Sequence, residues 1–354
     1  MAGDACLSPV SCTRALSWEA LFQRRSGWIG GDAVDSVDLG GNRILWLFGD
    51  SLIGRVREGR REIRGMSRNA VAIQEGGNPS TARIRFYTGP DSFAGFFPPT
   101  RKGDWIWPCQ GGILTAEGLY LFLPEMTHVS SGKGAWDFHV RRMTLAKVLN
   151  PRDDPDHWVI RRYRMPFFRS GKGERLFGIP AGRHGPWIVI TGHEEDSQTG
   201  TRRMLAARIR GDRLEDFSNW EFRTKEGWSR DFGKAAPLCD DIGFERSVSY
   251  EPTLRRWLLV TSDRGLSDRI LLRTAPEPWG PWSPSRLLHR VGNAGKGLFS
   301  YAAKLHPGLD GSGSALLLSY VRNASDARRL SDPDLYRPEF LRIRLPAPSG
   351  SGLP

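Results

Sequence analysis

Cysteine is scarce in this sequence, and its spacing argues against a metal-binding or disulfide-stabilised domain. The chain has 354 residues and four cysteines, none of which forms a C-x-x-C pair. A structural zinc site is therefore not expected, and so few thiols do not make a disulfide framework in a chain of this length. No EF-hand or H-E-x-x-H pattern occurs either, so the sequence predicts no metal and no other cofactor.

Long apolar runs are also missing. No stretch approaches the ~20 apolar residues of a membrane helix, so a membrane is not an expected partner. The first residues, MAGDACLSPVSCTR, lack the basic segment and apolar core of a secretory signal. As the sequence is written we expect a cytoplasmic protein, or a secreted one if a leader is missing from it.

Positive charge is in excess, with 51 Lys and Arg against 39 Asp and Glu and a formal net charge of +12. The arginines are spread along the chain, so a solvated surface explains them more simply than an acidic partner does. No basic-aromatic motif of a known nucleic-acid-binding type occurs, and nucleic acid is not an expected partner. A phosphate-binding P-loop and a G-x-S-x-G elbow are absent too.

What the sequence does contain is a repeat of short apolar runs that end in polar residues. The runs are RILWLFGD (43–50), GLYLFLPEM (118–126), PWIVITGHEE (186–195), RWLLVTSD (256–263) and ALLLSYVRN (315–323). Their spacing of about 60–75 residues is typical of propeller blades lengthened by inserted loops. Before each run come a segment rich in small residues and a tight turn, such as GGN (40–42), which together predict a β-hairpin.

Further strands are predicted after each run. A third strand follows every run and a fourth follows four of them, whereas the fifth copy reaches the C-terminus without one. We therefore predict an all-β, single-domain, five-bladed β-propeller with four antiparallel strands per blade over residues 17–346. SWEALFQRR (17–25) is the predicted source of the missing strand, and residues 1–16 and 347–354 are predicted to be flexible. Two separate β-domains are the alternative, but no linker-like stretch divides the chain.

Two aspartates are predicted to meet at one mouth of this propeller. If GGN is the first hairpin turn, the antiparallel register places Asp32 opposite Asp50, with Cβ atoms ~4.5–5.5 Å apart. When two carboxyl groups lie this near to each other, one is expected to keep its proton while the other is ionised. A pair of this kind is what enzymes use to cleave glycosidic bonds. Gly31 and Gly49 leave room for a ligand beside them. The alternative is an aspartate that only caps a turn.

Other polar residues are predicted at the same mouth and are candidates for substrate binding. They are Gln110, Glu125, His193, Glu194, Glu245, Arg246, Asp263, Tyr301, Arg322 and Asn323. The connections on this face are long and those on the other face are short, and binding sites are usually built on long loops. The aromatic residues of these loops are predicted either to pack between blades or to stack on sugar rings; they are Phe96, Trp105, Trp107 and Trp136.

The sequence also resembles a known family. The segments GWIGGDAVDSVDLGGNRILWLFGDSLIG, SRNAVAI, RTAPEPWGPWS and YAAKLHPGL…LLLSYVRN are similar to those of domain of unknown function 4185, and the similarity extends over residues 25–345. Members of that family are five-bladed propellers, and some are glycoside hydrolases of family 183 that cleave D-arabinan internally. The resemblance implies that Asp32 and Asp50 are the acidic pair of the site, and it does not fix the substrate.

The resulting hypothesis is a glycoside hydrolase that acts on a furanoside-containing polysaccharide in the manner of an endo-D-arabinanase, with Asp32 and Asp50 as the catalytic pair. The alternative is a non-catalytic propeller that binds a glycan or a protein, because fold does not determine activity. The expected partner is a polysaccharide or oligosaccharide, and the protein is expected to be a monomer. The sugar, the linkage and the stereochemical outcome stay open.

Overall fold

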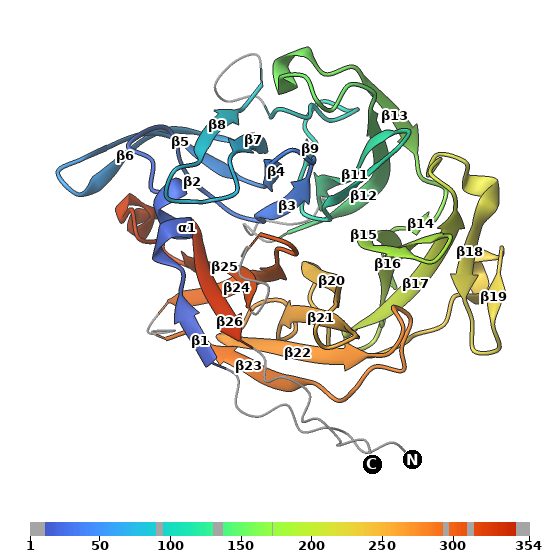
Figure 1. Cartoon of the computed structure of the whole chain (residues 1–354). Helices are drawn as coiled ribbons and strands as arrows, with labels where there is room; N and C mark the ends of the chain where they lie inside the picture. The colour runs from blue at the N-terminus through green and yellow to red at the C-terminus, as the bar shows by residue number, and fades with distance from the viewer. Residues whose placement is uncertain are drawn as a thin grey trace.

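Five antiparallel sheets surround a central axis and form the blades of a β-propeller (Figure 1). The computed structural model describes residues 11–89, 95–129, 137–171, 173–292, 297–309 and 315–344. The inner strands, which line the axis, are β3 (Asp35–Asp38), β10 (Gly112–Thr115), β15 (Arg175–His184), β20 (Arg246–Glu251) and β24 (Leu298–Leu305). The predicted all-β, five-bladed fold is confirmed.

In each blade the remaining strands follow one another outward from the axis. The second strands are β4 (Arg43–Phe48), β11 (Gly118–His128), β16 (Trp187–Glu195), β21 (Arg256–Ser262) and β25 (Leu316–Ala324). The third strands are β7 (Ala70–Glu75), β12 (Phe138–Val148), β17 (Arg202–Arg210), β22 (Arg269–Ala275) and β26 (Pro338–Arg344). The outer strands are β8 (Arg83–Tyr87), β13 (Ile160–Arg164), β18 (Trp220–Arg223), β23 (Arg286–Arg290) and β1 (Ser11–Arg14). Two sheets are extended by the short strands β9 (Trp105–Ile106), β14 (Phe168–Arg169) and β19 (Trp228–Ser229).

The second strands are continuously apolar because both of their faces are buried between blades. In β4, Leu45 and Leu47 pack into one core cluster, and Trp46 and Phe48 pack into another on the opposite side of the sheet. All four side chains are fully buried. Burial of such a side chain contributes roughly 1.5–3 kcal/mol, so each run anchors its blade to both neighbours.

A tight turn joins β3 to β4 and sets the register of the first blade. Gly40, Gly41 and Asn42 have φ angles of 76°, 61° and 61°, a left-handed conformation that glycine and asparagine adopt most readily. The face of the propeller that carries this turn and the other short hairpin turns is named the tight-turn face. The other face, where the long connections lie, is named the loop-rich face.

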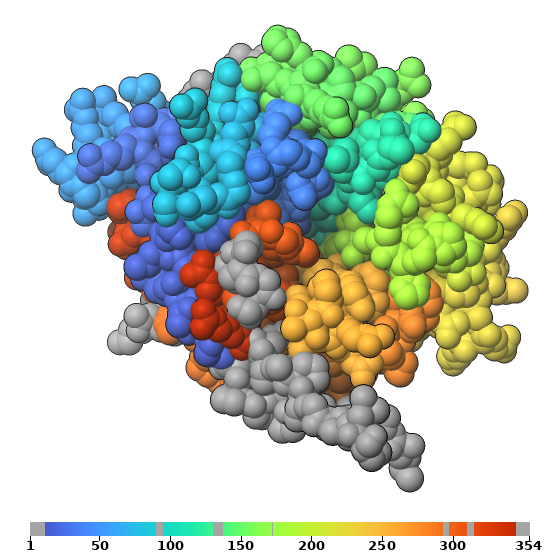
Figure 2. All heavy atoms as spheres, viewed as in Figure 1, coloured from blue at the N-terminus to red at the C-terminus, as the bar shows by residue number. Residues whose placement is uncertain are grey.

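The ring is closed by β1, which pairs with β26 as the outer strand of the fifth blade. Figures 1 and 2 show these first residues, in blue, beside the last strand, in red. The prediction that residues 17–25 supply this strand is wrong, because Leu16–Leu21 form the helix α1. Trp18, Leu21 and Phe22 lie on one helical face and are buried against the first and fifth blades.

The propeller therefore begins at Ser11, earlier than the predicted boundary at residue 17. The rest of the segment 1–16 and the tail 347–354 cannot be compared with the prediction, because residues 1–10 and 345–354 lie outside the described part of the chain. Within the described residues, no helix combines the length and the apolar character that crossing a membrane requires.

A sixth sheet of three strands lies beside the ring, and two of its strands form the long connection between β4 and β7. It contains β2 (Ser26–Gly31), β5 (Ser51–Arg57) and β6 (Arg60–Ser67), in the order β2-β5-β6. One of its faces packs on aromatic residues of the first blade, and the other packs on the connection between β25 and β26. The connections that the structure describes contain four short 3-10 helices: η1 (Pro155–His157), η2 (Phe217–Asn219), η3 (Phe232–Lys234) and η4 (Ala327–Ser331).

Candidate active site

Asp32 and Asp50 lie opposite each other on the loop-rich face. The regular β3–β4 ladder ends with Asp35 paired to Leu47. Beyond it the same register continues, because the backbone N–H of Asp32 donates to the carbonyl of Asp50 at 3.3 Å and that of Gly49 donates to the carbonyl of Asp32 at 3.0 Å. The predicted register of this hairpin is confirmed.

The backbone next to Asp32 is bent away from a regular strand. Ala33 and Val34 have φ angles of 68° and 47°, which are unfavourable for residues with a Cβ and cost roughly 1–3 kcal/mol each. A glycine is required at position 49, because a Cβ there would lie 2.5 Å from Oδ1 of Asp32. The strained residues and the missing side chain both allow the Asp32 carboxyl group to turn toward the mouth.

Two tyrosines from the fifth blade hold the carboxyl group of Asp32. The hydroxyl of Tyr301 donates to Oδ2 at 2.8 Å, and the hydroxyl of Tyr336 donates to the same oxygen at 3.1 Å. Asn323 in turn donates its side-chain amide to the Tyr301 hydroxyl at 3.2 Å. Three of the predicted residues, Asp32, Tyr301 and Asn323, thus form one hydrogen-bonded chain at the mouth.

Burial first, and then the negative charges of Asp50 and Glu245, raise the pKa of Asp32 to about 8. The hydrogen bonds from Tyr301 and Tyr336 oppose this shift because they stabilise the ionised carboxylate. The net effect is a carboxyl group that keeps its proton near neutral pH.

Asp50 has a different environment because a cation and an indole contact it. Arg68 lies 3.1 Å from its Oδ2, and the Nε1 of Trp107 donates to Oδ1 at 3.1 Å. The guanidinium of Arg68 also stacks on the ring of Trp105 at 4.9 Å. Burial raises the pKa of Asp50 above its ordinary value, and Arg68 and Trp107 oppose part of this rise by stabilising the carboxylate.

A buried lysine joins two further carboxylates beneath the pair. Lys304 is fully buried, and its Nζ lies 2.8 Å from Glu245, 2.9 Å from Asp35 and 2.6 Å from the carbonyl of Ala33. Burial alone lowers the pKa of Lys304, but Asp35 and Glu245 outweigh it and hold this pKa above its ordinary value. Lys304 thus joins the backbone next to Asp32 in the first blade to Glu245, which directly precedes β20 of the fourth blade.

Glu125 does not join this group. It lies within β11, whereas Asp50 follows the end of β4. Its side chain is fully buried, and it accepts hydrogen bonds from Thr100 at 2.6 Å, Thr144 at 2.9 Å and Arg141 at 3.0 Å. With its oxygens occupied in this way, Glu125 fastens the connection before β9 to its own blade.

His193 and Glu194 are also occupied within the third blade. His193 is fully buried, and its Nε2 lies 3.1 Å from Glu174. Burial and then the nearby Arg246 hold the pKa of His193 well below its usual value. Glu194 forms ion pairs with Arg175 and, at 2.7 Å, with Arg203.

Asp263 and Arg322 form ion pairs within their own blades. Asp263 lies 3.3 Å from Arg269, and Arg322 pairs with Glu339. Among the described residues, neither side chain forms a hydrogen bond or an ion pair with Asp32 or Asp50. Their roles as substrate contacts remain predictions.

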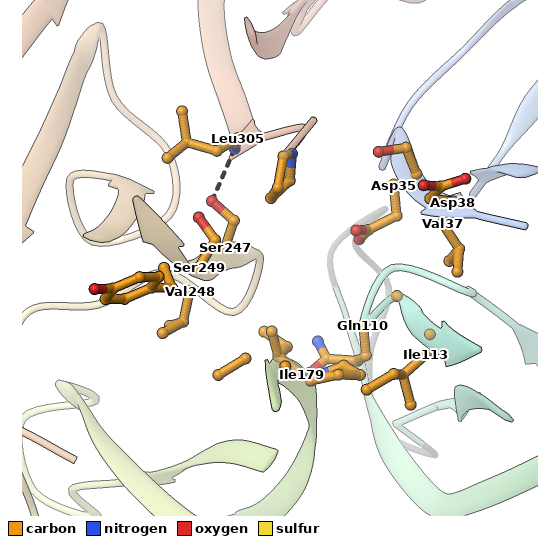
Figure 3. Close-up of a pocket in the computed structure, with 18 of the residues that line it drawn as sticks. Asp35, Val37, Asp38, Gln110, Ile113, Ile179, Ser247, Val248, Ser249 and Leu305 are labelled. Carbon is orange, nitrogen blue, oxygen red and sulfur yellow. Dashed lines mark hydrogen bonds between the residues drawn. The ribbon is translucent and has the colours of Figure 1, made fainter. Parts of the chain in front are cut away.

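Gln110 and Arg246 line a cavity of about 420 Å³ on the propeller axis (Figure 3). Gln110 donates its amide to the carbonyl of Phe244 at 3.2 Å. Arg246 is buried and donates to the carbonyl of Gly192 at 2.7 Å. This cavity lies along the inner strands toward the tight-turn face. Within the described part of the chain, neither side chain forms a hydrogen bond or an ion pair with Asp32 or Asp50.

Several site residues were missed by sequence reasoning. Arg68, Tyr336 and Lys304 contact the acidic residues through their side chains but lie in segments without any polar motif. Trp107 was predicted either to pack between blades or to stack on a sugar ring, and its hydrogen bond to Asp50 was not predicted. Of the other loop aromatics, Phe96 and Trp105 pack against neighbouring rings, and Trp136 lies outside the described residues.

Within the described part of the chain, no group of three or more His, Cys, Asp and Glu side chains is arranged to hold a metal ion. The side chains described at this mouth are two carboxyl groups with tyrosine, arginine and indole partners.

The fold and these contacts define the chain as a five-bladed β-propeller with two opposed aspartates at its axial mouth. It belongs to the family described as Domain of unknown function (DUF5005), whose model matches residues 16–345. The resemblance to domain of unknown function 4185 is therefore wrong. Small residues on inner strands, tight turns and apolar second strands are required by blade geometry, so they do not separate one propeller family from another. A search of curated proteins found no match to the chain.

Solved structures share this fold over nearly the whole chain. A candidate hydrolase from Bacteroides ovatus ATCC 8483 is 18% identical with a TM-score of 0.73, and the match covers 94% of this chain and 90% of that one. An α-L-arabinofuranosidase from Lactobacillus brevis is 11% identical with a TM-score of 0.54, with coverage of 97% and 99%. A family 117 glycoside hydrolase from the marine bacterium Zobellia galactanivorans is 11% identical with a TM-score of 0.50, with coverage of 97% and 92%. At these identities the similarity shows the shared fold.

Proposed function

We propose that the protein is a glycoside hydrolase that uses Asp32 and Asp50 as its catalytic pair. The observation that carries the proposal is the unequal environment of two opposed carboxyl groups. Asp32 has a pKa of about 8 and only neutral hydrogen-bond donors, whereas Asp50 has the cation Arg68 at 3.1 Å. One protonated and one ionised carboxyl group are what acid-assisted cleavage of a glycosidic bond requires.

In the proposed reaction Asp32 donates its proton to the glycosidic oxygen while the bond from that oxygen to the anomeric carbon breaks. The leaving sugar departs as an alcohol, and Asp32 becomes a carboxylate that the hydroxyls of Tyr301 and Tyr336 stabilise. Asp50 acts either as the nucleophile at the anomeric carbon or as the base that takes a proton from the attacking water. Arg68 favours the ionised form of Asp50 for that step.

The proposed substrate is a glycan that contains furanosides. The supporting comparison is the arabinofuranosidase, whose fold matches this chain along 97% of its length. Trp107 is partly exposed beside Asp50 and packs edge-on against Phe138 at 4.8 Å. An indole in this position offers a sugar ring an apolar face next to the reacting carboxyl groups.

The experiment is a hydrolysis screen of the purified protein against furanosidic and pyranosidic polysaccharides, followed by variants. Asp32→Asn and Asp50→Asn should each lower turnover by about 10²–10⁴-fold without loss of the circular dichroism spectrum. Asp326→Asn is the matched control, because this exposed carboxylate pairs only with the neighbouring Arg328 among the described residues. Wild-type activity that survives in both site variants would contradict the proposed pair.

Glu245 is the alternative partner for Asp32, since its charge contributes to the raised pKa of that residue. If Glu245→Gln removes activity and Asp50→Asn does not, the second carboxylate is Glu245. The other alternative is a non-catalytic glycan-binding propeller. Binding of a glycan with no hydrolysis anywhere in the screen, and with equal affinity in the wild type and both aspartate variants, would favour it.

A further inference from the structure

The axial cavity is a separate compartment from the carboxylate pair. It has a volume of about 420 Å³ and lies among the inner strands, toward the tight-turn face (Figure 3). Asp35 belongs to its wall, and the buried Lys304 binds Asp35 on one side and the carbonyl next to Asp32 on the other. Lys304 therefore stands between the cavity and the mouth that contains Asp32.

The backbone of the inner strands gives this cavity many hydrogen-bonding groups. β3, β10, β20 and β24 are each the last strand of their sheet and pair with one neighbour only. Their second edges face the axis, where their N–H and C=O groups need a partner other than a strand. A ligand that fits here must both donate and accept hydrogen bonds along its length.

The charged side chains of the wall are of both signs, Asp35 and Asp38 against Arg183 and Arg246. The guanidinium of Arg246 donates to backbone carbonyls. Gln110 is 1% exposed, and its Oε1 has no hydrogen-bond partner among the described residues. Ser249 lies on the wall and is buried. Asp35 has its charge balanced by Lys304, and Arg183 has its own balanced by Asp212. These groups favour a neutral ligand over an anion or a cation.

An exposed aromatic ring stands at the rim of the cavity. Tyr250 lines the cavity and is 45% exposed. Its ring lies 5.5 Å from that of the buried Trp257, which also lines the cavity and lies 6.0 Å from His184. A rigidly supported aromatic surface beside a polar cavity suits a sugar, whose ring has an apolar face and a hydroxylated edge.

We propose that the axial cavity is a second carbohydrate site, which binds a neutral mono- or disaccharide, or the end of a neutral glycan, with Tyr250 as the stacking residue at its entrance. The volume lies within the ~300–1,000 Å³ of small-molecule sites. The free edges of the inner strands β3, β10, β20 and β24 supply hydrogen-bond partners for the sugar hydroxyl groups. Gln110 supplies a buried acceptor, its Oε1. This site does not depend on the carboxylate pair being catalytic.

The test measures binding of xylobiose, lactose and D-galacturonic acid to the full chain by saturation-transfer NMR and calorimetry. The Asp32→Asn/Asp50→Asn double variant serves as the host, so that hydrolysis cannot consume the sugar. We expect a neutral disaccharide to bind it, Tyr250→Ala to weaken binding by about tenfold, and Tyr250→Phe to retain binding. Ser249→Phe, which fills the cavity, should abolish binding, whereas Ser249→Ala should retain it.

Melting curves establish that each variant is folded, and Tyr250→Ala keeps the test decisive if Ser249→Phe fails to fold, because Tyr250 is on the surface. The proposal is overturned if neither neutral disaccharide binds at about 10 mM. It is also overturned if binding is equal in Tyr250→Ala and in the host. Tighter binding of galacturonic acid than of the neutral sugars would overturn the assignment of a neutral ligand.

Discussion

The hydroxyl of Tyr336 lies 3.1 Å from Oδ2 of Asp32, although 304 residues separate them in the chain. Tyr336 comes from the last connection of the fifth blade and Asp32 from the start of the first blade. The candidate site thus lies across the seam where the ring closes. Tyr301 and Tyr336, which bind the carboxyl group of Asp32, reach it only when the fifth blade lies beside the first.

Removal of this hydroxyl should raise the pKa of Asp32. In Tyr336→Phe the ionised carboxylate loses a donor while the protonated form loses less, so up to about a tenfold decrease in the acid dissociation constant is expected. Because Asp32 is proposed to act in its protonated form, the alkaline limb of the kcat/KM profile should move to higher pH. The measurement is hydrolysis from pH 5 to 10, with Tyr320→Phe as the control, since Tyr320 binds Glu339 instead. An alkaline limb that stays in place or moves down contradicts this role of Tyr336.

Arg68 should act on the opposite limb of the same profile. Its guanidinium lowers the pKa of Asp50, so Arg68→Gln should raise that pKa and move the acidic limb upward. Because the Arg68 side chain is 45% exposed, solvent weakens the effect, and about a tenfold loss of kcat/KM at pH 5 is expected. Arg68→Lys should recover part of the loss.

The matched control for Arg68 is Arg64→Gln, which removes an exposed arginine from the preceding strand β6. It should leave the acidic limb unchanged. Equal losses in the two variants would mean that the overall positive charge, and not the contact with Asp50, supports activity.

The blades and the Asp32–Asp50 register were predictable because they depend on residues that are close in sequence. A turn of Gly-Gly-Asn fixes which residues of β3 and β4 face each other, and the pairing follows from it. The closing strand was not predictable in the same way. Ser11–Arg14 contain no apolar repeat, whereas Trp18, Leu21 and Phe22 are apolar at helical spacing, which was mistaken for a strand.

The partners of the acidic pair were less predictable, because they arrive from distant segments. Trp107 and Tyr336 reach the two aspartates from the second and fifth blades, and no local pattern marks them. Glu125 shows the opposite error. It lies near the end of its apolar run, as Asp50 does, but Thr100 and Arg141 bind its carboxylate. The sequence of one strand gives no sign of such partners from other segments.

The raised pKa of Asp32 has a consequence for stability. A carboxyl group whose pKa rises from 3.8 to about 8 on folding contributes stability fully below the lower value and loses it as the pH rises through the higher one. The wild type should therefore lose stability relative to Asp32→Asn between pH 4 and 8. Urea unfolding at pH 5, 7 and 9 measures this difference.

Asp326→Asn provides a control of opposite sign, because a side-chain hydrogen bond from Arg328 lowers the pKa of Asp326. Stability from that group is present at neutral pH and is lost as the pH falls. If Asp32→Asn shows no growing advantage with pH, Asp32 is not protonated in the folded protein near neutrality.

Ring closure by β1 should be measurable by truncation. Deletion of residues 1–14 removes the four residue pairs between β1 and β26. The lost hydrogen bonds should lower the free energy of unfolding by about 2–4 kcal/mol. It also leaves the edge of β26 open to pairing with another chain, so aggregation should increase. Deletion of residues 1–10 alone is the control and should cost little. Equal stability of the two truncations would show that β1 does not close the ring.

Lys304 should be the most sensitive charged residue of the fold. It is fully buried and balances Asp35 and Glu245, so Lys304→Met leaves two buried carboxylates without their cation. Breaking a buried ion pair in this way costs about 3–5 kcal/mol, whereas Arg328→Ala, which breaks a pair whose arginine side chain is 91% exposed, should leave stability almost unchanged. The triple variant Lys304→Met/Asp35→Asn/Glu245→Gln should recover part of the loss, because it removes the uncompensated charges together with the cation. Urea unfolding of the wild type, Lys304→Met, the triple variant and Arg328→Ala separates a charge effect from a packing effect. A triple variant as unstable as Lys304→Met would mean that the aliphatic stem of Lys304, and not its charge, stabilises the fold.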